Sequence, residues 1–418
     1  MPADSLEPSA LRPPSARRLL PLLGPAMVAG VAYLDPGNVA TNVSAGARYG
    51  YLLVWVVVIA NATAWLVQYL SAKLGLTTGR SLPALLGERL RWRPGRWAFW
   101  LQAELVAMAT DIAEVLGGAI ALQLLFGLPL LMGGVITGGV SMLLLVIHAR
   151  GGSAAFERVV TGLVVIIGVG FCAGILFAPV DGRQAAMGLV PHFTDGGSVL
   201  LAASIIGATV MPHAIYAHSA LTRDRFGRVP EGWQRRQVLR ATRVDVTVAL
   251  GVAGTVNVVI LLLAAATLRG VEGTTTLEGA HDAIGVALGP VVATLFAVGL
   301  LASGLASTSV GAYAGAEVMR GLLRVRLPLL AQRLITLVPA LVILALGVDP
   351  TFALVLSQVA LSFGIPFALI PLVRLTSRRE LLGDATNRWW TTALAVVATV
   401  MLVALNVTLL VLVGLGAG

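Results

Sequence analysis

Long apolar stretches alternate with short polar segments along the whole chain. A helix needs about 20 apolar residues to cross a lipid bilayer. Eleven stretches of this kind are predicted, at 19–44, 50–75, 98–126, 129–148, 157–178, 197–222, 242–268, 286–316, 328–348, 351–374 and 389–414. The pattern predicts an all-α polytopic membrane protein, with residues 1–18 as a tail before the first span.

Polar residues and a proline interrupt two of these spans near mid-depth. The first span contains Asp-Pro-Gly-Asn at 35–38, within AYLDPGNVATN, and the sixth contains Met-Pro-His at 211–213, within GATVMPHAIYAHS. A proline inside a helix removes one backbone hydrogen bond and breaks or kinks the helix. Two discontinuous helices are therefore expected, with breaks at Pro36, Gly37 and Pro212.

The positions of the two breaks predict an internal repeat. Spans one to five cover 19–178, spans six to ten cover 197–374, and the span at 389–414 is left over. Five is an odd number, so two consecutive five-span units have opposite orientations in the membrane, as in inverted-repeat transporters. Each unit opens with a broken helix, which is the mark expected of such a repeat.

Composition agrees with a membrane protein. Of the 418 residues, 57% are hydrophobic and 12% are charged, against about 25% charged in soluble proteins, and the mean hydropathy is +0.89. The single cysteine, Cys172, excludes a disulfide framework and a cysteine-rich zinc cluster.

The basic excess has a topological explanation. The net charge is +9 and the sequence pI is about 10.7. With the N-terminus in the cytoplasm, every Lys and Arg except Arg48, Arg183 and Arg269 falls in or beside a predicted cytoplasmic segment. This distribution follows the positive-inside rule and predicts a cytoplasmic N-terminus and an external C-terminus. The lipid bilayer, and not nucleic acid, is the expected partner of these charges.

The two breaks bring together a mixed set of possible metal ligands. Pro36 and Pro212 are expected to free the carbonyl oxygens of Ala32 and Ala208, four residues earlier. A free carbonyl in hydrocarbon is costly unless it lines a cavity or meets a ligand. The alternative is two proline kinks that neighbouring helices satisfy.

Asp35 and Asn38 at the first break, with Met211 at the second, complete the set. Oxygen ligands alone suit sodium, calcium or magnesium, whereas a methionine sulfur favours softer transition metals. A site with one carboxylate is also expected to release a divalent ion readily. Ordinary packing is the alternative for Met211.

A stripe of carboxylates marks the third span, ELVAMATDIAEVLGG. Glu104, Asp111 and Glu114 lie within about 80° of one another on a helical wheel. Acidic residues inside a span are expensive and usually functional, so a proton pathway is expected. Arg333, at the predicted cytoplasmic start of span nine, is the candidate basic partner, and a purely structural salt bridge is the alternative.

Two histidines and two amides are weaker candidates. His213 follows Pro212 and could assist proton movement, because histidine titrates near neutrality. His218 lies five residues further on and does not share its helical face. A hydrogen-bonded core histidine is the alternative for both, and an interhelical hydrogen bond is the common role of lone amides such as Asn257 and Gln358.

The paired motifs resemble those of the Nramp family (natural resistance-associated macrophage proteins). The likeness covers nearly the whole chain, including ARYGYLLVW, IIGATVMPHAIYAHSAL and LLASGLAST. The resemblance implies a bacterial inner-membrane protein with a LeuT-type fold. It also implies proton-coupled import of Mn²⁺ and Fe²⁺, with Cd²⁺ and Co²⁺ as further substrates, by alternating access and without a cofactor or an obligate protein partner.

The resemblance also implies residue roles. Asp35, Asn38 and Met211 match the family's metal ligands, joined by the carbonyls of Ala208 and Ala32. Gln358 falls where a glutamine can approach the metal. A second group matches the family's proton pathway: Asp35, His213, Asp111, Glu114 and Arg333. Asn42 departs from the acidic residue of many relatives, and Met211 is absent from relatives that carry magnesium or aluminium.

Three other functions are compatible with a polytopic membrane protein. A sodium-coupled carrier of a small organic solute would not place Asp35 against the substrate's carboxylate. An intramembrane enzyme could use Asp111, Glu114 and His213, but the sequence contains no HExxH or GxSxG motif. A channel also uses broken helices, and the predicted inverted repeat favours a carrier over it. Since no Walker A sequence occurs, ion gradients are the expected energy source.

Overall fold

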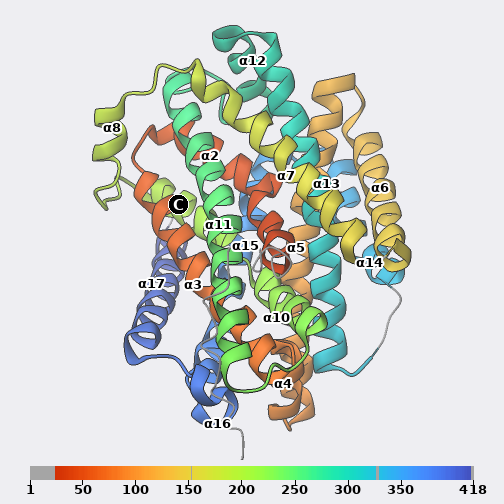
Figure 1. Ribbon diagram of the computed structural model, residues 1–418. Coiled ribbons are helices and arrows are strands. Elements are labelled where there is room, and N and C mark those ends of the chain that lie inside the picture. The colour runs from red at the N-terminus through yellow and green to blue at the C-terminus, as the bar shows by residue number, and fades with distance from the viewer. Residues whose placement is uncertain (1–23, 152, 326–328, 416–418) are drawn as a thin grey trace, which may run out of the picture.

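The computed structural model describes residues 24–151, 153–325 and 329–415, and every element in these ranges is a helix (Figure 1). The predicted tail at 1–18 lies outside the described residues. The helices of the first half are α1 (Pro25–Gly30), η3 (Val31–Leu34), α2 (Pro36–Tyr49), α3 (Val54–Thr78), α4 (Leu82–Arg89), α5 (Arg93–Phe126), α6 (Leu130–Gly151), α7 (Ser153–Cys172) and η4 (Ala173–Leu176).

The second half continues in the same way. Its helices are α8 (Gly182–Met187), α9 (Gly196–Thr209), α10 (Pro212–Phe226), α11 (Trp233–Thr267), α12 (Leu277–Leu288), α13 (Pro290–Leu322), α14 (Leu329–Ala345), α15 (Pro350–Thr376), α16 (Arg379–Leu382), η5 (Gly383–Ala385) and α17 (Trp389–Gly414). Figure 1 shows α8 and α12 at one end of the bundle and α4 and α16 at the other.

The all-α prediction is correct, and each predicted span overlaps a helix of the structure. Among the described residues, eight helices are long and apolar enough to cross a membrane. Three further apolar helices are shorter, at Pro25–Leu34, Leu130–Leu143 and Leu330–Ala345. The number of eleven crossings therefore stays a prediction, as do the ranges of the two repeats. The short helices α4, α8, α12 and α16 were not foreseen, because they lie between apolar stretches.

Both predicted helix breaks are present. The first helix ends with the short 3₁₀ segment η3 and restarts as α2 at Pro36, with Asp35 extended between them. The sixth span ends as α9 at Thr209 and restarts as α10 at Pro212. Each proline occupies the first position of the new helix, where its fixed φ is favourable and its missing N–H costs nothing.

Glycines allow helices to approach closely around the first break. A Cβ added to Gly117 of α5 would lie 2.0 Å from the Cβ of Pro36. A Cβ added to Gly207 of α9 would lie 1.9 Å from the carbonyl oxygen of Gln358 on α15. These contacts place α2, α5, α9 and α15 against one another, so the break is enclosed by helices and fully buried.

The outer face of the bundle is apolar. Large hydrophobic side chains on α17 are exposed, among them Val397, Val400, Val407 and Leu410. An apolar surface of this kind suits lipid contact and not water. The polar side chains that a soluble protein would place outside are instead gathered in the interior, at the two breaks and along α5.

Candidate functional site

The sequence Asp-Pro-Gly-Asn forms the start of a helix. Asp35 is the N-cap residue of α2, and its Oδ1 accepts the backbone N–H of Asn38 at 2.9 Å. Aspartate is a favoured N-cap, and the positive end of the helix dipole stabilises a carboxylate there. The motif therefore holds a buried carboxylate at the N-terminus of α2.

The second break is capped differently. Met211 is the N-cap residue of α10, and its side chain makes no capping hydrogen bond. Residues with a side-chain oxygen are preferred at this position because they accept a backbone N–H. A methionine here gives up that stabilisation, and it leaves a fully buried thioether at the gap between α9 and α10.

The Asn38 side chain connects the two breaks. Its Nδ2 donates to Asp35 Oδ1 at 2.9 Å and to the carbonyl oxygen of Ala208 at 2.7 Å. Thr209 Oγ1 donates to Asn38 Oδ1 at 3.3 Å. The amide N–H₂ thus lies between a carboxylate and a carbonyl at the C-terminal end of α9, two groups that also attract a cation.

Gln358 on α15 reaches the same carboxylate. Its Nε2 donates to Asp35 Oδ2 at 3.3 Å, while its Oε1 is buried and has no hydrogen-bond partner among the described residues. Gly37 makes room for it, since a Cβ there would lie 1.7 Å from Gln358 Nε2. Three N–H donors therefore surround Asp35 from two helices.

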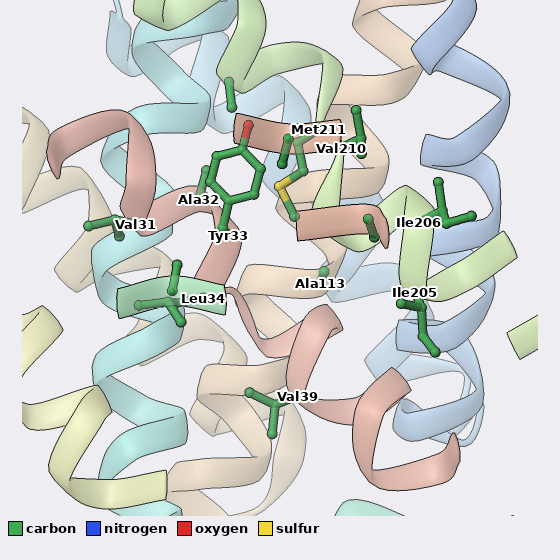
Figure 2. Close-up of a cluster of buried hydrophobic side chains, with 14 of the residues drawn as sticks. Val31, Ala32, Tyr33, Leu34, Val39, Ala113, Ile205, Ile206, Val210 and Met211 are labelled. Atoms are coloured by element: carbon green, nitrogen blue, oxygen red, sulfur yellow. The ribbon is translucent and has the colours of Figure 1, made fainter. Parts of the chain in front are cut away.

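Ala32 and Met211 lie at the two breaks, and within the described ranges neither side chain forms a hydrogen bond to this group. Both are fully buried at their breaks. Figure 2 shows Ala32, Tyr33 and Met211 among the labelled side chains of the buried cluster that surrounds the two breaks. Of the six expected metal ligands, hydrogen bonds join Asp35, Asn38, Gln358 and the Ala208 carbonyl. The metal-binding roles of all six stay predictions.

Side chains of neighbouring helices take up carbonyls released at the first break. Asn257 Nδ2 on α11 donates to the carbonyl of Tyr33 at 3.0 Å, and the Ser303 hydroxyl on α13 donates to the carbonyl of Leu34. The interhelical role expected of Asn257 is thus correct. Ser303 was missed, because a small hydroxyl in LLASGLAST resembles many membrane-helix serines that bond to their own helix.

Two of the three carboxylates of the α5 stripe, Asp111 and Glu114, share a partner. Arg333 Nη1 donates to both Asp111 Oδ1 and Glu114 Oε2, the second at 3.4 Å. Ser141 accepts from Arg333 Nε at 3.0 Å, and Thr308 accepts from its Nη2 at 3.4 Å. The expected partner of the stripe is therefore correct.

Arg333 lies deeper than its position at the start of a span suggested. Its side chain is 0% exposed, and those of Asp111 and Glu114 are 7% and 0% exposed. One guanidinium thus faces two carboxyl groups in a dry environment. With both carboxyls ionised the cluster has a net charge of −1, and one bound proton makes it neutral.

Glu104 is buried on the same helix but shares no hydrogen bond or ion pair with this cluster in the described part of the chain. Seven residues separate it from Asp111, a rise of about 10 Å along α5. Its role in a proton pathway stays a prediction.

The two histidines have different surroundings. His213 Nδ1 lies 3.2 Å from the hydroxyl of Thr110, next to Asp111, and its Nε2 is buried without a partner among the described residues. His213 therefore lies between the second break and the arginine cluster. His218 Nδ1 contacts Gln68 Oε1 at 2.7 Å, and Gln68 donates to the Tyr33 hydroxyl. His218 is thus hydrogen-bonded in the core, which was the alternative considered for it.

Two further acidic residues, Glu317 and Asp245, have partners in ion pairs or hydrogen bonds. Glu317 forms ion pairs with Arg223 at 2.9 Å and Arg320 at 2.8 Å. Asp245 on α11 is buried and accepts the backbone N–H groups of Gly24 and Ala26, at 3.1 and 2.9 Å. Asp245 thus holds the N-terminus of α1 against α11.

The sequence of the chain matches the model of a known protein family. The model named natural resistance-associated macrophage protein-like matches residues 26–412, which is nearly the whole described chain. The chain belongs to the Nramp family. The resemblance expected from the two motifs is therefore confirmed.

Curated relatives and solved structures agree with this assignment. The chain is 59% identical over 389 residues to the divalent metal cation transporter MntH of Mycobacterium tuberculosis (strain H37Rv), covering 93% of this chain and 91% of that protein. It is 44% identical over 397 residues to MntH of Bacillus subtilis, covering 94% and 93%. The crystal structure of an Eremococcus coleocola manganese transporter matches with a TM-score of 0.84 and 32% identity, covering 95% of this chain and 88% of that one.

More distant structures show the fold alone. MhsT matches with a TM-score of 0.65 at 13% identity, and Mhp1 with a TM-score of 0.55 at 15% identity. The LeuT-type architecture expected for an Nramp protein is confirmed, and this Nramp chain is a membrane transporter and not an enzyme.

Proposed function

We propose that this Nramp protein imports divalent transition-metal ions, with Mn²⁺ and Fe²⁺ as principal substrates and Cd²⁺ and Co²⁺ as further ones. The observation that carries the proposal is the grouping of Asp35, Asn38, the Ala208 carbonyl and Gln358 around two helix breaks. The relatives' names, divalent metal cation transporter and manganese transporter, support the same class of substrate.

The donor set supports a transition metal over calcium or magnesium. Asp35 supplies one negative charge, and Asn38 supplies a neutral oxygen once its amide turns from its present hydrogen bonds. The thioether of Met211 is a soft ligand, which adds little for hard cations and favours softer ones. Its presence at an N-cap, where it forms no hydrogen bond, is explained if it contacts the ion.

Proton coupling is the second part of the proposal. The cluster of Arg333 with Asp111 and Glu114 holds one cation against two carboxyls, so it can gain and lose one proton without leaving a large uncompensated charge. His213 connects the second break to this cluster through Thr110. Asp35 is expected to exchange a proton for the metal, and Glu104 to extend the route.

Alternating access around the broken helices would expose the metal site to each side in turn. The proposed location is the inner membrane of a bacterium, with the N-terminus in the cytoplasm and the C-terminus outside. Protons and metal ions are the proposed ligands, with no cofactor, nucleic acid or obligate protein partner required.

Reconstitution into liposomes tests the proposal. Uptake of Mn²⁺, Fe²⁺, Cd²⁺, Co²⁺, Mg²⁺ and Ca²⁺ is measured together with the pH of the lumen, and liposomes without protein serve as the control. We expect Mn²⁺ to enter with acidification of the lumen, and Ca²⁺ and Mg²⁺ to enter poorly. Absence of Mn²⁺ uptake would overturn the proposal that Mn²⁺ is a substrate. Mn²⁺ uptake without a pH change would overturn the proposed proton coupling.

A further inference from the structure

Two aligned stripes of side chains run along α3 and α11, which lie side by side (Figure 1). On each helix the stripe positions are three or four residues apart, so they share one face. The stripe of α3 consists of Val58, Ala62, Trp65, Tyr69 and Lys73. The stripe of α11 consists of Arg236, Arg240, Arg243, Thr247, Gly251, Gly254 and Val258.

The apolar parts of the two stripes line a groove of about 470 Å³. Its lining includes the small residues Ala62, Gly251 and Gly254, together with Val58 and Val258. A Cβ added to Gly251 would meet no atom within 4 Å, so the space above this glycine is open. In a membrane protein this groove faces lipid chains.

Aromatic side chains close the groove at the end where the arginines lie. Trp65 Nε1 donates to Thr247 Oγ1 at 3.0 Å across the two helices. The Trp65 and Tyr69 rings stack, with centroids 6.1 Å apart and planes 13° apart. Tryptophan and tyrosine are enriched at the level of the lipid headgroups. The stacked Trp65 and Tyr69 rings, called the ledge below, therefore mark the depth at which a headgroup would lie.

Two cations converge on the Tyr69 ring just beyond the ledge. The Arg243 guanidinium carbon lies 5.2 Å from the ring centroid, and the Lys73 ammonium lies 5.9 Å from it. Lys73 is buried and donates to Asn387 Oδ1, whereas Arg243 is exposed. Within the described ranges, neither cation has a carboxylate at ion-pair distance.

This arrangement leaves positive charge without compensation. Like charges so close repel each other, and more strongly near a low-dielectric region than in water. Arg240 and Arg236 continue the exposed basic stripe one and two turns further on, respectively. An anion at this place would neutralise the repulsion, and the adjoining groove fits an anion that carries an apolar chain.

We propose that the groove between α3 and α11 binds an anionic glycerophospholipid. One acyl chain lies in the groove over Gly251, and the glycerol region contacts the stacked Trp65 and Tyr69 rings. The phosphate is bound by the exposed Arg243, and the buried Lys73 adds positive potential. Neither group belongs to the proposed metal or proton route, so the site stands independently of the transported ion.

Native mass spectrometry of the full-length protein in detergent tests the proposal. The protein is titrated with phosphatidylglycerol and with phosphatidylcholine of identical acyl chains. Arg243→Gln removes the phosphate contact, and Arg91→Gln, an exposed arginine before α5, removes the same charge elsewhere. Gly251→Leu fills the groove, and Gly139→Leu adds the same side chain at an exposed glycine of α6 that also has open space around it.

We expect phosphatidylglycerol to bind more tightly than phosphatidylcholine. Arg243→Gln should weaken phosphatidylglycerol binding about fivefold, as expected for one basic residue near a membrane surface, and should leave phosphatidylcholine binding unchanged. Gly251→Leu should weaken the binding of both lipids. Equal binding of the two lipids by the unmodified protein, or test variants that behave like their controls, would overturn the proposal.

Discussion

The buried cluster around Arg333 makes a strong prediction about stability. Arg333→Met removes the cation that pairs with Asp111 and Glu114, whose side chains are 7% and 0% exposed. Breaking a buried ion pair by removing one partner costs about 3–5 kcal/mol, because the remaining charge has no compensation. We expect a loss of this size, because water cannot reach the carboxyls to replace the guanidinium.

Neutralising both carboxylates should restore part of the stability that Arg333→Met loses. Adding Asp111→Asn and Glu114→Gln to Arg333→Met removes the two charges that the first change left unpaired. Replacing a whole buried ionic group by neutral groups is often close to neutral for stability. The triple variant should therefore be more stable than Arg333→Met alone, although it can no longer couple metal uptake to protons.

Arg235 provides the matched control. It is also buried, with a side chain 4% exposed, but its partners Glu231 and Asp384 are 62% and 38% exposed. Water can solvate those carboxylates after Arg235→Met, but the carbonyls of Val229 and Leu382 also lose a donor. We therefore expect a loss of about 1–3 kcal/mol, smaller than that of Arg333→Met.

The assay is thermal unfolding in detergent at neutral pH, followed by fluorescence-detected size exclusion. We expect the unmodified protein to have the highest unfolding temperature, followed by Arg235→Met and then Arg333→Met. The triple variant should unfold at a higher temperature than Arg333→Met. An Arg333→Met variant as stable as the unmodified protein, or a triple variant no more stable than Arg333→Met, would show that the buried carboxyls do not need the guanidinium.

Two further predictions concern the breaks. Met211→Leu keeps the volume and removes the sulfur, so Ca²⁺ and Mg²⁺ should compete better against Mn²⁺ uptake, while Mn²⁺ still enters with lower affinity. Ser303→Ala leaves the carbonyl of Leu34 without its side-chain donor and should lower the free energy of unfolding by about 1–3 kcal/mol, measured by thermal unfolding.

Controls for these two variants come from the outer face of the bundle. Met401→Leu on α17 should leave ion competition unchanged. Thr255→Val should have little effect on unfolding, because the Thr255 hydroxyl is exposed and bonds to the Gly251 carbonyl of its own helix. Unchanged competition by Ca²⁺ and Mg²⁺ in Met211→Leu would show that the thioether does not set the ion selectivity. Equal stability of Ser303→Ala and Thr255→Val would show that the Leu34 carbonyl needs no side-chain partner.

The two breaks were predictable from sequence because each violates a strong rule. Charged and polar residues with a proline in an apolar span are expensive, so their positions at 35–38 and 211–213 stand out without any structure. Arg333 was found in the same way, as a charge at the edge of a span. Its depth was not, because burial depends on how α14 packs against α5 and α6.

The supporting contacts were harder to predict. Ser303 and Thr209 donate to groups at the breaks, yet hydroxyls in helices very often bond to the carbonyl four residues back, as Thr209 also does. Nothing in the local sequence separates the two uses. The link from His213 to Thr110 likewise depends on packing between helices far apart in the chain.

The proposed transport depends on Asp35 as a metal ligand, and uptake of radioactive Mn²⁺ into proteoliposomes measures that role. The comparison is between Asp35→Ala and Asp349→Ala. Asp349 is also an N-cap residue followed by proline, and it accepts the backbone N–H of Phe352 at 2.6 Å, but it is exposed. Each variant loses one helix cap, worth about 1 kcal/mol. We expect Asp35→Ala to abolish Mn²⁺ uptake and Asp349→Ala to retain it. Normal uptake by Asp35→Ala would show that Asp35 is not needed to bind the metal.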